Sequence, residues 1–163
     1  MTTTTPFEQG PYLSAALLCE KVLTEQDGVK LAIRIIDRVT RTVAGPSPPE
    51  DMAPFDYEVT LLLRLKSGRA RGGKPLRIVL VKPSGGSSTP LHQTISFEGE
   101  DDRGWDVVVN MRIRIEEPSV YWFQVYLDDV RLTQVPLRVV YQVRRIHGPT
   151  GGPPPTQEPP AGS

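Results

Sequence analysis

The sequence is poor in cysteine and histidine, with one cysteine, Cys19, and two histidines, His92 and His147. A lone cysteine forms no internal disulfide, which indicates a reducing compartment. With so few candidates, neither a nucleophile–base pair nor a set of metal ligands can be assembled. We therefore expect no enzymatic activity, no catalytic residue, no metal site and no cofactor.

Long apolar runs are also absent. No stretch approaches the roughly 20 apolar residues of a membrane span. The amino end, MTTTTPFEQGPY, lacks the basic segment and the apolar segment of a signal peptide. We expect a cytoplasmic protein that does not bind a membrane.

Neither sign of charge is in excess, because 19 lysines and arginines balance 19 aspartates and glutamates. Proteins that bind nucleic acids usually carry a basic excess, and a polybasic membrane anchor needs clustered basic residues. The charge balance therefore argues against nucleic acid as a partner.

What the sequence does have is a central region of alternating apolar and polar residues between two ends that lack periodicity. We expect residues 1–11 to be disordered, because they are rich in threonine and end in a Pro-Gly-containing stretch. Residues 147–163 are rich in proline and glycine and are predicted to be a disordered tail. Residues 12–146 remain for one β-sandwich domain, which is large enough to fold without a metal or a disulfide.

Alternation with a period of two predicts strands rather than helices. The clearest segments are 57–66 and 107–116, and the second places five apolar residues on one face: Val107, Val109, Met111, Ile113 and Ile115. Further strands are predicted at 13–25, 29–43, 76–82, 91–98, 120–128 and 132–143. For 13–25 a helix is the alternative, because the segment is rich in helix formers, but the Asp-Gly turn directly after it favours a strand. The pattern predicts an all-β fold, an antiparallel β-sandwich of about eight strands.

The segment 29–43 is predicted to be one strand whose core face carries Val29, Leu31, Ile33, Ile35 and Val39. Asp37 falls on the same face, where a buried carboxylate would need an arginine or backbone amides as partners. The preceding Asp27-Gly28 pair predicts a tight type I′ hairpin turn. A second turn, at Asp128-Asp129, is expected to join the last two strands.

Three segments stand out together: ALLCEKVL (16–23) followed by Asp27-Gly28, IRIIDRV (33–39), and the block from Val109 through PSVYWFQVYLDD (118–129) to VPLRVVY (135–141). As a set they are similar to a family of short bacterial proteins of unknown function. The resemblance covers most of the central region and implies a bacterial origin and a strand-rich fold. It implies no activity and no site.

The closing block also resembles the last strands of immunoglobulin-like sandwiches. In those domains a tyrosine near the start of the penultimate strand hydrogen-bonds back across the preceding corner. Tyr121, in the sequence Pro118-Ser119-Val120-Tyr121, is the candidate for this position. The resemblance implies the fold only, because a fold does not fix a function.

Two loops concentrate charge. Residues 98–106 are acidic and, with Asp128 and Asp129, are the candidate calcium site, but their spacing matches no EF-hand loop and Arg103 lies among them. Residues 66–74 are basic and glycine-rich but lack the order of a phosphate-binding P-loop. We expect both to be solvated loops, and Cys19, in an apolar register, to be a buried and inert thiol.

The candidate interaction surface is the outer face of the strand 120–128. Tyr121, Phe123, Val125 and Leu127 are expected in the core, which turns Trp122 and Tyr126 outward. Large aromatic residues on an outer face are frequent at binding hot spots. The alternative is structural, because Arg112 or Arg114 on the preceding strand, or Arg138 on the following one, would stack on these rings.

These observations favour a non-enzymatic module that binds an unknown protein partner, associates with itself or has a structural role. The alternative is a ligand- or calcium-binding β-sandwich that uses the loops at one end.

Overall fold

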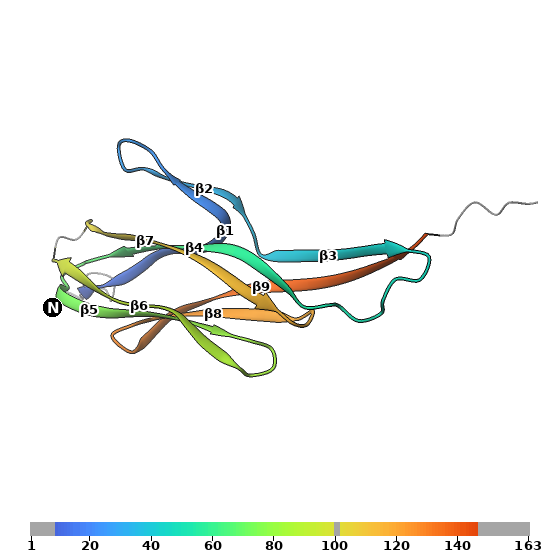
Figure 1. The fold of residues 1–163 in the computed structure, drawn as a ribbon. Helices are drawn as coiled ribbons and strands as arrows, with labels where there is room; N and C mark the ends of the chain where they lie inside the picture. Colours follow the sequence, from blue (N-terminus) through green and yellow to red (C-terminus); the bar gives the residue numbers. More distant parts are fainter. Residues whose placement is uncertain (1–8, 100–101, 147–163) are drawn as a thin grey trace, which may run out of the picture.

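In the computed structural model, which describes residues 9–99 and 102–146, nine strands form two sheets (Figure 1). The four-stranded sheet has the order β2-β1-β4-β7, and the five-stranded sheet has the order β3-β9-β8-β5-β6. The strands are β1 (Tyr12–Thr24), β2 (Lys30–Ile35), β3 (Arg38–Gly45), β4 (Phe55–Lys66), β5 (Arg71–Val81), β6 (Ser87–Glu98), β7 (Gly104–Ile115), β8 (Val120–Leu127) and β9 (Val130–Arg145). The prediction of an all-β fold is confirmed.

The ninth strand arises because the segment 29–43 divides between the two sheets. The backbone nitrogen of Ile36 still donates to Leu18 of β1, at 2.9 Å, whereas the carbonyl of Asp37 accepts from Arg138 of β9, also at 2.9 Å. Arg34, just before the break, has a positive φ of 52°. The chain thus leaves the four-stranded sheet and enters the five-stranded one within two residues.

The predicted core face of the segment fails before this break. Val29, Leu31 and Ile35 are exposed, Ile35 by 67%, whereas Ile36 packs against the core. Asp37 is exposed rather than buried and therefore needs no buried partner. Alternation does not reveal the point where a strand changes sheets, so the predicted face is wrong for Val29, Leu31 and Ile35. Val39, beyond the break, packs against the core as predicted.

The pairing is antiparallel except between β3 and β9, which run parallel from Arg38–Arg138 to Gly45–Arg145. The five-stranded sheet is therefore mixed, and the prediction of a purely antiparallel sandwich is wrong for this pair. On its other side β9 pairs with β8. It therefore connects β3, which follows the four-stranded sheet in the chain, to the β8–β9 hairpin.

The core lies between the sheets and is filled by alternate residues of the long strands. The predicted inward faces of β7 and β8 are confirmed, since all their inward residues are buried: Val107, Val109, Met111, Ile113, Ile115, Tyr121, Phe123, Val125 and Leu127. Burying one such side chain contributes about 1.5–3 kcal/mol. The same alternation turns the intervening residues outward, among them Arg112 and Arg114 of β7.

Two of the predicted turns are present, and the first of them has a geometry different from that expected. Asp27-Gly28 lies in the β1–β2 hairpin, but only Gly28 has a positive φ, and Glu25 and Val29 close a longer loop. The turn with two positive φ values, 52° and 60°, is instead Asp128-Asp129, which joins β8 to β9 as expected.

Of the two ends predicted to be disordered, residues 1–8 and 147–163 lie outside the described residues. Among the described residues, no helix has the length and apolar character needed to cross a membrane.

Candidate functional site

The two sheets are left open along one side, where β6 ends one sheet and β7 ends the other. The strands meet near one end, because the indole nitrogen of Trp105 on β7 donates to the carbonyl of Ser96 on β6 at 2.7 Å. At the other end, Nζ of Lys82 after β5 lies 3.1 Å from Oε2 of Glu116 after β7. Between these two contacts the edges of β6 and β7 are not paired with each other.

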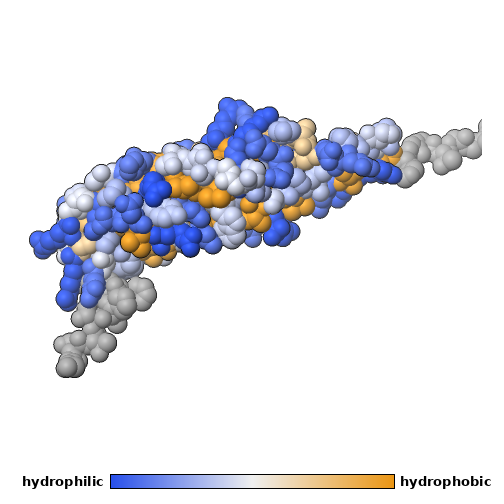
Figure 2. Space-filling view, turned by 90° about the horizontal axis from the view of Figure 1, so that it is seen from below, coloured by the Kyte–Doolittle hydropathy of each residue, from blue (hydrophilic) through white to orange (hydrophobic). Residues whose placement is uncertain are grey.

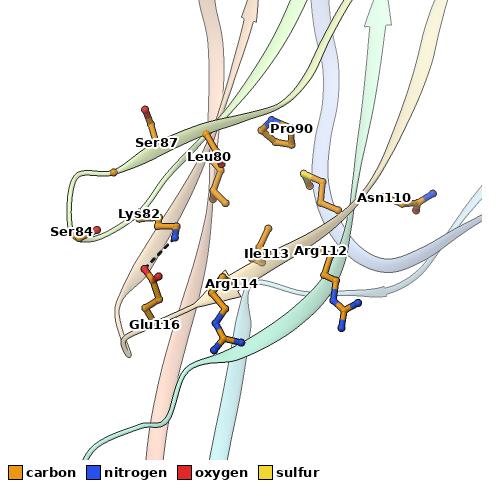
Figure 3. A pocket seen from close by; sticks show the side chains of 13 residues that line it. Leu80, Lys82, Ser84, Ser87, Pro90, Asn110, Arg112, Ile113, Arg114 and Glu116 are labelled. Atoms are coloured by element: carbon orange, nitrogen blue, oxygen red, sulfur yellow. Dashed lines mark hydrogen bonds and ion pairs between the residues drawn. The ribbon is translucent and has the colours of Figure 1, made fainter.

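The space between them is a groove of about 620 Å³, lined by side chains from residues 80–90 on one wall and residues 110–116 on the other. We call it the edge groove. Leu80, Met111 and Ile113 supply its apolar floor and are themselves almost fully buried. In Figure 3, Leu80 and Ile113 point toward each other, whereas Arg112 and Arg114 point away from the floor. The groove thus has an apolar bottom and a charged rim.

The rim carries two arginines that share one carboxylate. Arg114 Nη1 lies 3.1 Å from Oδ1 of Asp56, and Arg112 Nε lies 3.6 Å from Oδ2 of the same residue. Both arginine side chains remain largely exposed, at 69% for Arg112 and 49% for Arg114. Both arginines lie on β7, the terminal strand of their sheet. A molecule that binds beside β7 would therefore lie next to these two cations.

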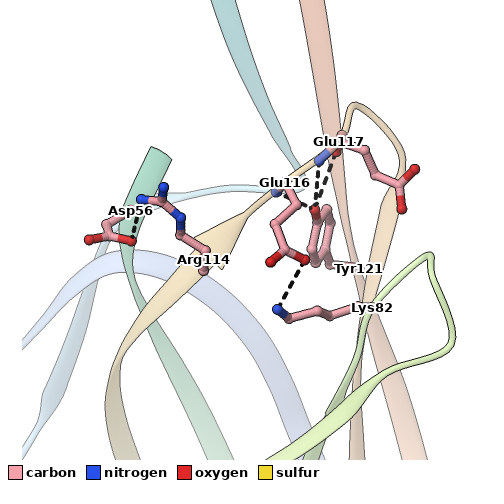
Figure 4. A network of polar contacts seen from close by, with 6 residues as sticks. All are labelled: Asp56, Lys82, Arg114, Glu116, Glu117 and Tyr121. Carbon is pink, nitrogen blue, oxygen red and sulfur yellow. Dashed lines mark hydrogen bonds and ion pairs between the residues drawn. The ribbon is translucent and has the colours of Figure 1, made fainter. Parts of the chain in front are cut away.

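The end of β7 is held by Tyr121. Its hydroxyl accepts hydrogen bonds from the backbone nitrogens of Glu116, at 2.9 Å, and Glu117, at 3.2 Å, and donates to the carbonyl of Glu117 at 3.3 Å (Figure 4). The expected hydrogen bonding of Tyr121 across the corner is confirmed. It positions Glu116 for its ion pair with Lys82 and so fixes one end of the edge groove.

The structure separates the residues of the predicted interaction surface. Trp122 and Tyr126 lie on the outer face of the five-stranded sheet, whereas Arg112 and Arg114 lie in the other sheet and line the edge groove. The chain crosses between the sheets after β7, so β8 has β5 and β9 as neighbours. The expected stacking of Arg112 or Arg114 on these rings therefore does not occur.

Another arginine takes that place. Arg77 on β5 pairs with Tyr126 across the strands, and its guanidinium lies 4.5 Å from the centre of the tyrosine ring. The Tyr126 hydroxyl donates to Gln124 at 2.9 Å. Seen from below, the surface carries patches of apolar residues among hydrophilic ones (Figure 2). These contacts give Tyr126 a structural use.

Arg138 remains near Trp122. Both line a shallow hollow of about 280 Å³ together with Asp37 and Arg38, at the point where β3 joins the five-stranded sheet. The hollow has an aromatic wall and groups of both charges. It is smaller than the edge groove, and its strands β8 and β9 are paired on both sides.

A further surface lies on the β1–β2 hairpin, which projects from the body of the molecule (Figure 1). Four of its large apolar side chains are exposed: Leu23, Val29, Leu31 and Ile35. Where the hairpin leaves the sheet, a cleft of about 360 Å³ opens beside Thr60, whose hydroxyl bonds Glu20 and Asn110. The sequence offers no sign of this surface, since alternation predicts these residues in the core.

Among the described residues, neither Cys19 nor the acidic side chains that the sequence singles out lie in a reactive arrangement. Cys19 is a buried free thiol, as expected, and burial raises its pKa, which keeps it in the less nucleophilic form. Within residues 9–99 and 102–146, no group of three His, Cys, Asp or Glu residues is placed to hold a metal ion. Residues 100 and 101 of the acidic loop lie outside these ranges. Of the remaining acids, Glu98 pairs with Arg103, Asp128 with Lys74 and Asp129 with Arg77.

The basic segment 66–74 is a loop only over residues 67–70, between β4 and β5. Residues Arg71 to Lys74 belong to β5 and pair with β6, with Arg71 opposite Glu98. Gly72 and Gly73 are thus paired with β6 inside the sheet, Gly72 with a positive φ of 83°, and are not part of a flexible loop that could hold a phosphate. The prediction of a loop is wrong here because glycine, which usually marks a turn, lies within a strand.

Comparison with known proteins adds a family but no activity. Residues 14–140 match a family of unknown function, DUF6941. No curated protein is similar to the chain at a significant level.

One similar solved structure is the alkylpurine DNA glycosylase AlkC of Pseudomonas fluorescens, bound to DNA with an abasic site analog. It is 11% identical to this chain, with a TM-score of 0.33. The match covers 61% of this chain and 27% of that one. A β-glucosidase from Listeria innocua in complex with glucose is 9% identical, with a TM-score of 0.38 and coverage of 81% of this chain and 17% of the other. This chain spans less than a third of either protein, and neither likeness bears on its function.

Proposed function

This chain belongs to DUF6941, a family of unknown function, and we propose that it is a non-enzymatic protein-interaction module whose binding site is the edge groove. The observation that carries the proposal is an open groove of about 620 Å³ between two sheet edges, with an apolar floor and an arginine rim. Binding sites in proteins are typically concave and mostly apolar, with a few polar groups that set orientation.

The groups around the groove favour binding over catalysis. The side chains that line it include no histidine and no cysteine. Its charged groups are engaged in ion pairs, Lys82 with Glu116 and both arginines with Asp56. A general base or a nucleophile needs a partner arranged for proton transfer, and this lining offers none.

We further propose that the sandwich is immunoglobulin-like. The parallel pairing of β3 with the last strand and the corner hydrogen bonds of Tyr121 support this assignment. A bacterial origin and a cytoplasmic location are proposed as well, and they rest on the sequence resemblance and on the single cysteine.

The proposal is tested by site-specific photo-crosslinking in cells of the source organism. A photoreactive amino acid replaces Ser88 on the groove wall, Leu31 on the hairpin, or Thr42 on the exposed side of β3 as the control. We expect a discrete protein adduct from position 88 and none from position 42. An adduct from position 31 alone, or equal labelling at all three positions, contradicts the groove as the binding site.

A further inference from the structure

We propose that the edge groove binds an extended segment of a partner protein, which adds as a strand to the outer edge of β7 and alternates apolar with acidic side chains. The inference rests on the proposed function and deepens it, because it assigns the chemistry of the partner. Four features of the groove support it.

The first feature is the unused hydrogen-bonding edge of β7. Within the described residues, β7 pairs with β4 along its whole length and with no strand on its other side. In an antiparallel strand, alternate residues direct their N–H and C=O groups away from the neighbour, here toward the groove. Such edges readily accept another strand. Residues 110–116 extend for about 20 Å, which about six residues of a bound strand would cover.

The second feature is that no proline, bulge or shortening protects this edge. Its charged side chains, Arg112 and Arg114, oppose a basic strand but not an acidic one. Proteins guard exposed edges with prolines, bulges, short strands or charged side chains. The opposite wall follows this rule, because Pro90 lies in β6 and the β5–β6 pairing is irregular between Ile78 and Leu80. By contrast, β7 has twelve residues, no proline and an unbroken register with β4. The regular edge of β7, rather than that of β6, is therefore the one that accepts the strand.

The third feature is the alternation of side chains along β7. Met111 and Ile113 face the floor, so every second residue of the added strand would face an apolar surface. Its other residues would lie beside Arg112 and Arg114 on the outer face, where opposite charges stabilise a cross-strand pair. Asp56 on β4 pairs with both arginines from the other side, but their side chains stay 69% and 49% exposed and can donate to a second carboxylate. The residues next to the arginines are therefore expected to be acidic.

The fourth feature disfavours a second copy of this chain as the occupant. If two copies paired through β7 in antiparallel fashion about Ile113, Arg112 of one copy would lie opposite Arg114 of the other. Like charges directly opposite each other destabilise a strand pair. A strand from a different, acidic partner meets no such repulsion.

The experiment uses three seven-residue fluorescent peptides with capped ends and the full chain. The first alternates glutamate and valine, the second alternates lysine and valine, and the third is the first with N-methyl groups on every second residue along the pairing edge. By fluorescence anisotropy we expect the glutamate peptide to bind at least about ten-fold more tightly than the other two. Each ten-fold corresponds to about 1.4 kcal/mol.

Two protein variants locate the peptide. Arg112→Glu combined with Arg114→Glu should reverse the preference toward the lysine peptide, and both positions are exposed, so circular dichroism should be unchanged. Arg138→Glu, on the other sheet, is the matched control and should leave the preference intact. Equal binding of the methylated peptide, or a preference that survives the double reversal, overturns strand addition.

The outcomes separate this inference from the proposed function. A crosslink at position 88 together with no discrimination among the peptides keeps the groove as a protein-binding site and rejects the added strand. No crosslink at position 88 and no peptide binding reject both.

Discussion

The indole nitrogen of Trp105 donates a hydrogen bond to the carbonyl of Ser96 at 2.7 Å, and these two residues belong to different sheets. The contact joins the two sheets near one end of their open side, although the Trp105 ring is itself half exposed. The edge groove lies between this contact and the Lys82–Glu116 ion pair, where β6 and β7 are not paired with each other.

Trp105→Phe should loosen this end without unfolding the domain. It removes one hydrogen bond at an exposed site, which is worth about 0.5–1.5 kcal/mol or less. Hydrogen–deuterium exchange should therefore rise in peptides covering residues 94–98 and 104–108. Trp122→Phe is the control, because it changes the same residue type on another face, and it should leave exchange in these peptides unchanged. Equal exchange in both variants would show that the contact does not hold the edges.

Tyr121→Phe should destabilise the protein by about 1–3 kcal/mol, because it leaves the backbone nitrogens of Glu116 and Glu117 without their acceptor. Urea denaturation at constant m-value measures the change. Tyr126→Phe loses only a hydroxyl that bonds the Gln124 side chain and should cost about 0.5 kcal/mol or less. Similar losses in the two variants would mean that the corner contributes nothing specific.

Gly104→Ala should destabilise by about 1–3 kcal/mol through overpacking. A Cβ at this position would overlap the carbonyl of Leu65 and lie 2.9 Å from Cα of Lys66, where β7 begins beside β4. Gly45→Ala is the matched control, since nothing lies within 4 Å of the added carbon there. Thermal melting of both variants checks the difference, and a neutral Gly104→Ala would show that the strand ends move away from each other freely.

Asp106 should make the stability depend on pH. Its carboxylate accepts two hydrogen bonds from Arg64, at 2.7 and 2.9 Å, and these lower the pKa of Asp106 in the folded protein. A lowered folded pKa gives stability that is present above the unfolded value of about 3.9 and is lost as pH falls through the folded value. Because the Arg64 side chain stays 45% exposed, solvent screening limits the effect at pH 7 to below about 1 kcal/mol.

Asp106→Asn should therefore differ from the wild type at pH 7 and converge with it as the pH falls below about 4. Arg64→Gln should show the same convergence, because it removes the other half of the pair. Chemical denaturation across this pH range measures both. A difference between wild type and variant that grows on acidification would contradict the assignment.

A strand of this fold is predictable from the sequence where it stays in one sheet and turns the same face to the core along its length. Along β7 and β8 every second side chain is buried, so alternation identifies the inward face correctly. The prediction for the segment 29–43 fails because Ile36 and Asp37 hydrogen-bond to different sheets, and alternation carries no information about such a change. The positive φ at Arg34 gives no warning, because arginine is not a residue that favours that conformation.

The sequence does not predict the edge groove, although Arg112 and Arg114 are among the predicted surface residues. Neighbouring strands in sequence usually pair in space, which predicts these arginines beside Trp122 and Tyr126. The link between β7 and β8 instead crosses to the other sheet. The groove exists because β6 and β7 are both terminal strands, and alternation alone does not give strand order.

The parallel pairing of β3 with β9 also decides how the molecule responds to a pulling force. The first and last strands begin and end at opposite ends of the molecule (Figure 1). Tension between Tyr12 and Arg145 acts along the strands, so β1 is drawn past β4, and β9 past β3 and β8. Bonds loaded in this direction share the load and yield together, whereas bonds pulled sideways would break in succession. Single-molecule stretching from these two ends should therefore record a single high-force rupture.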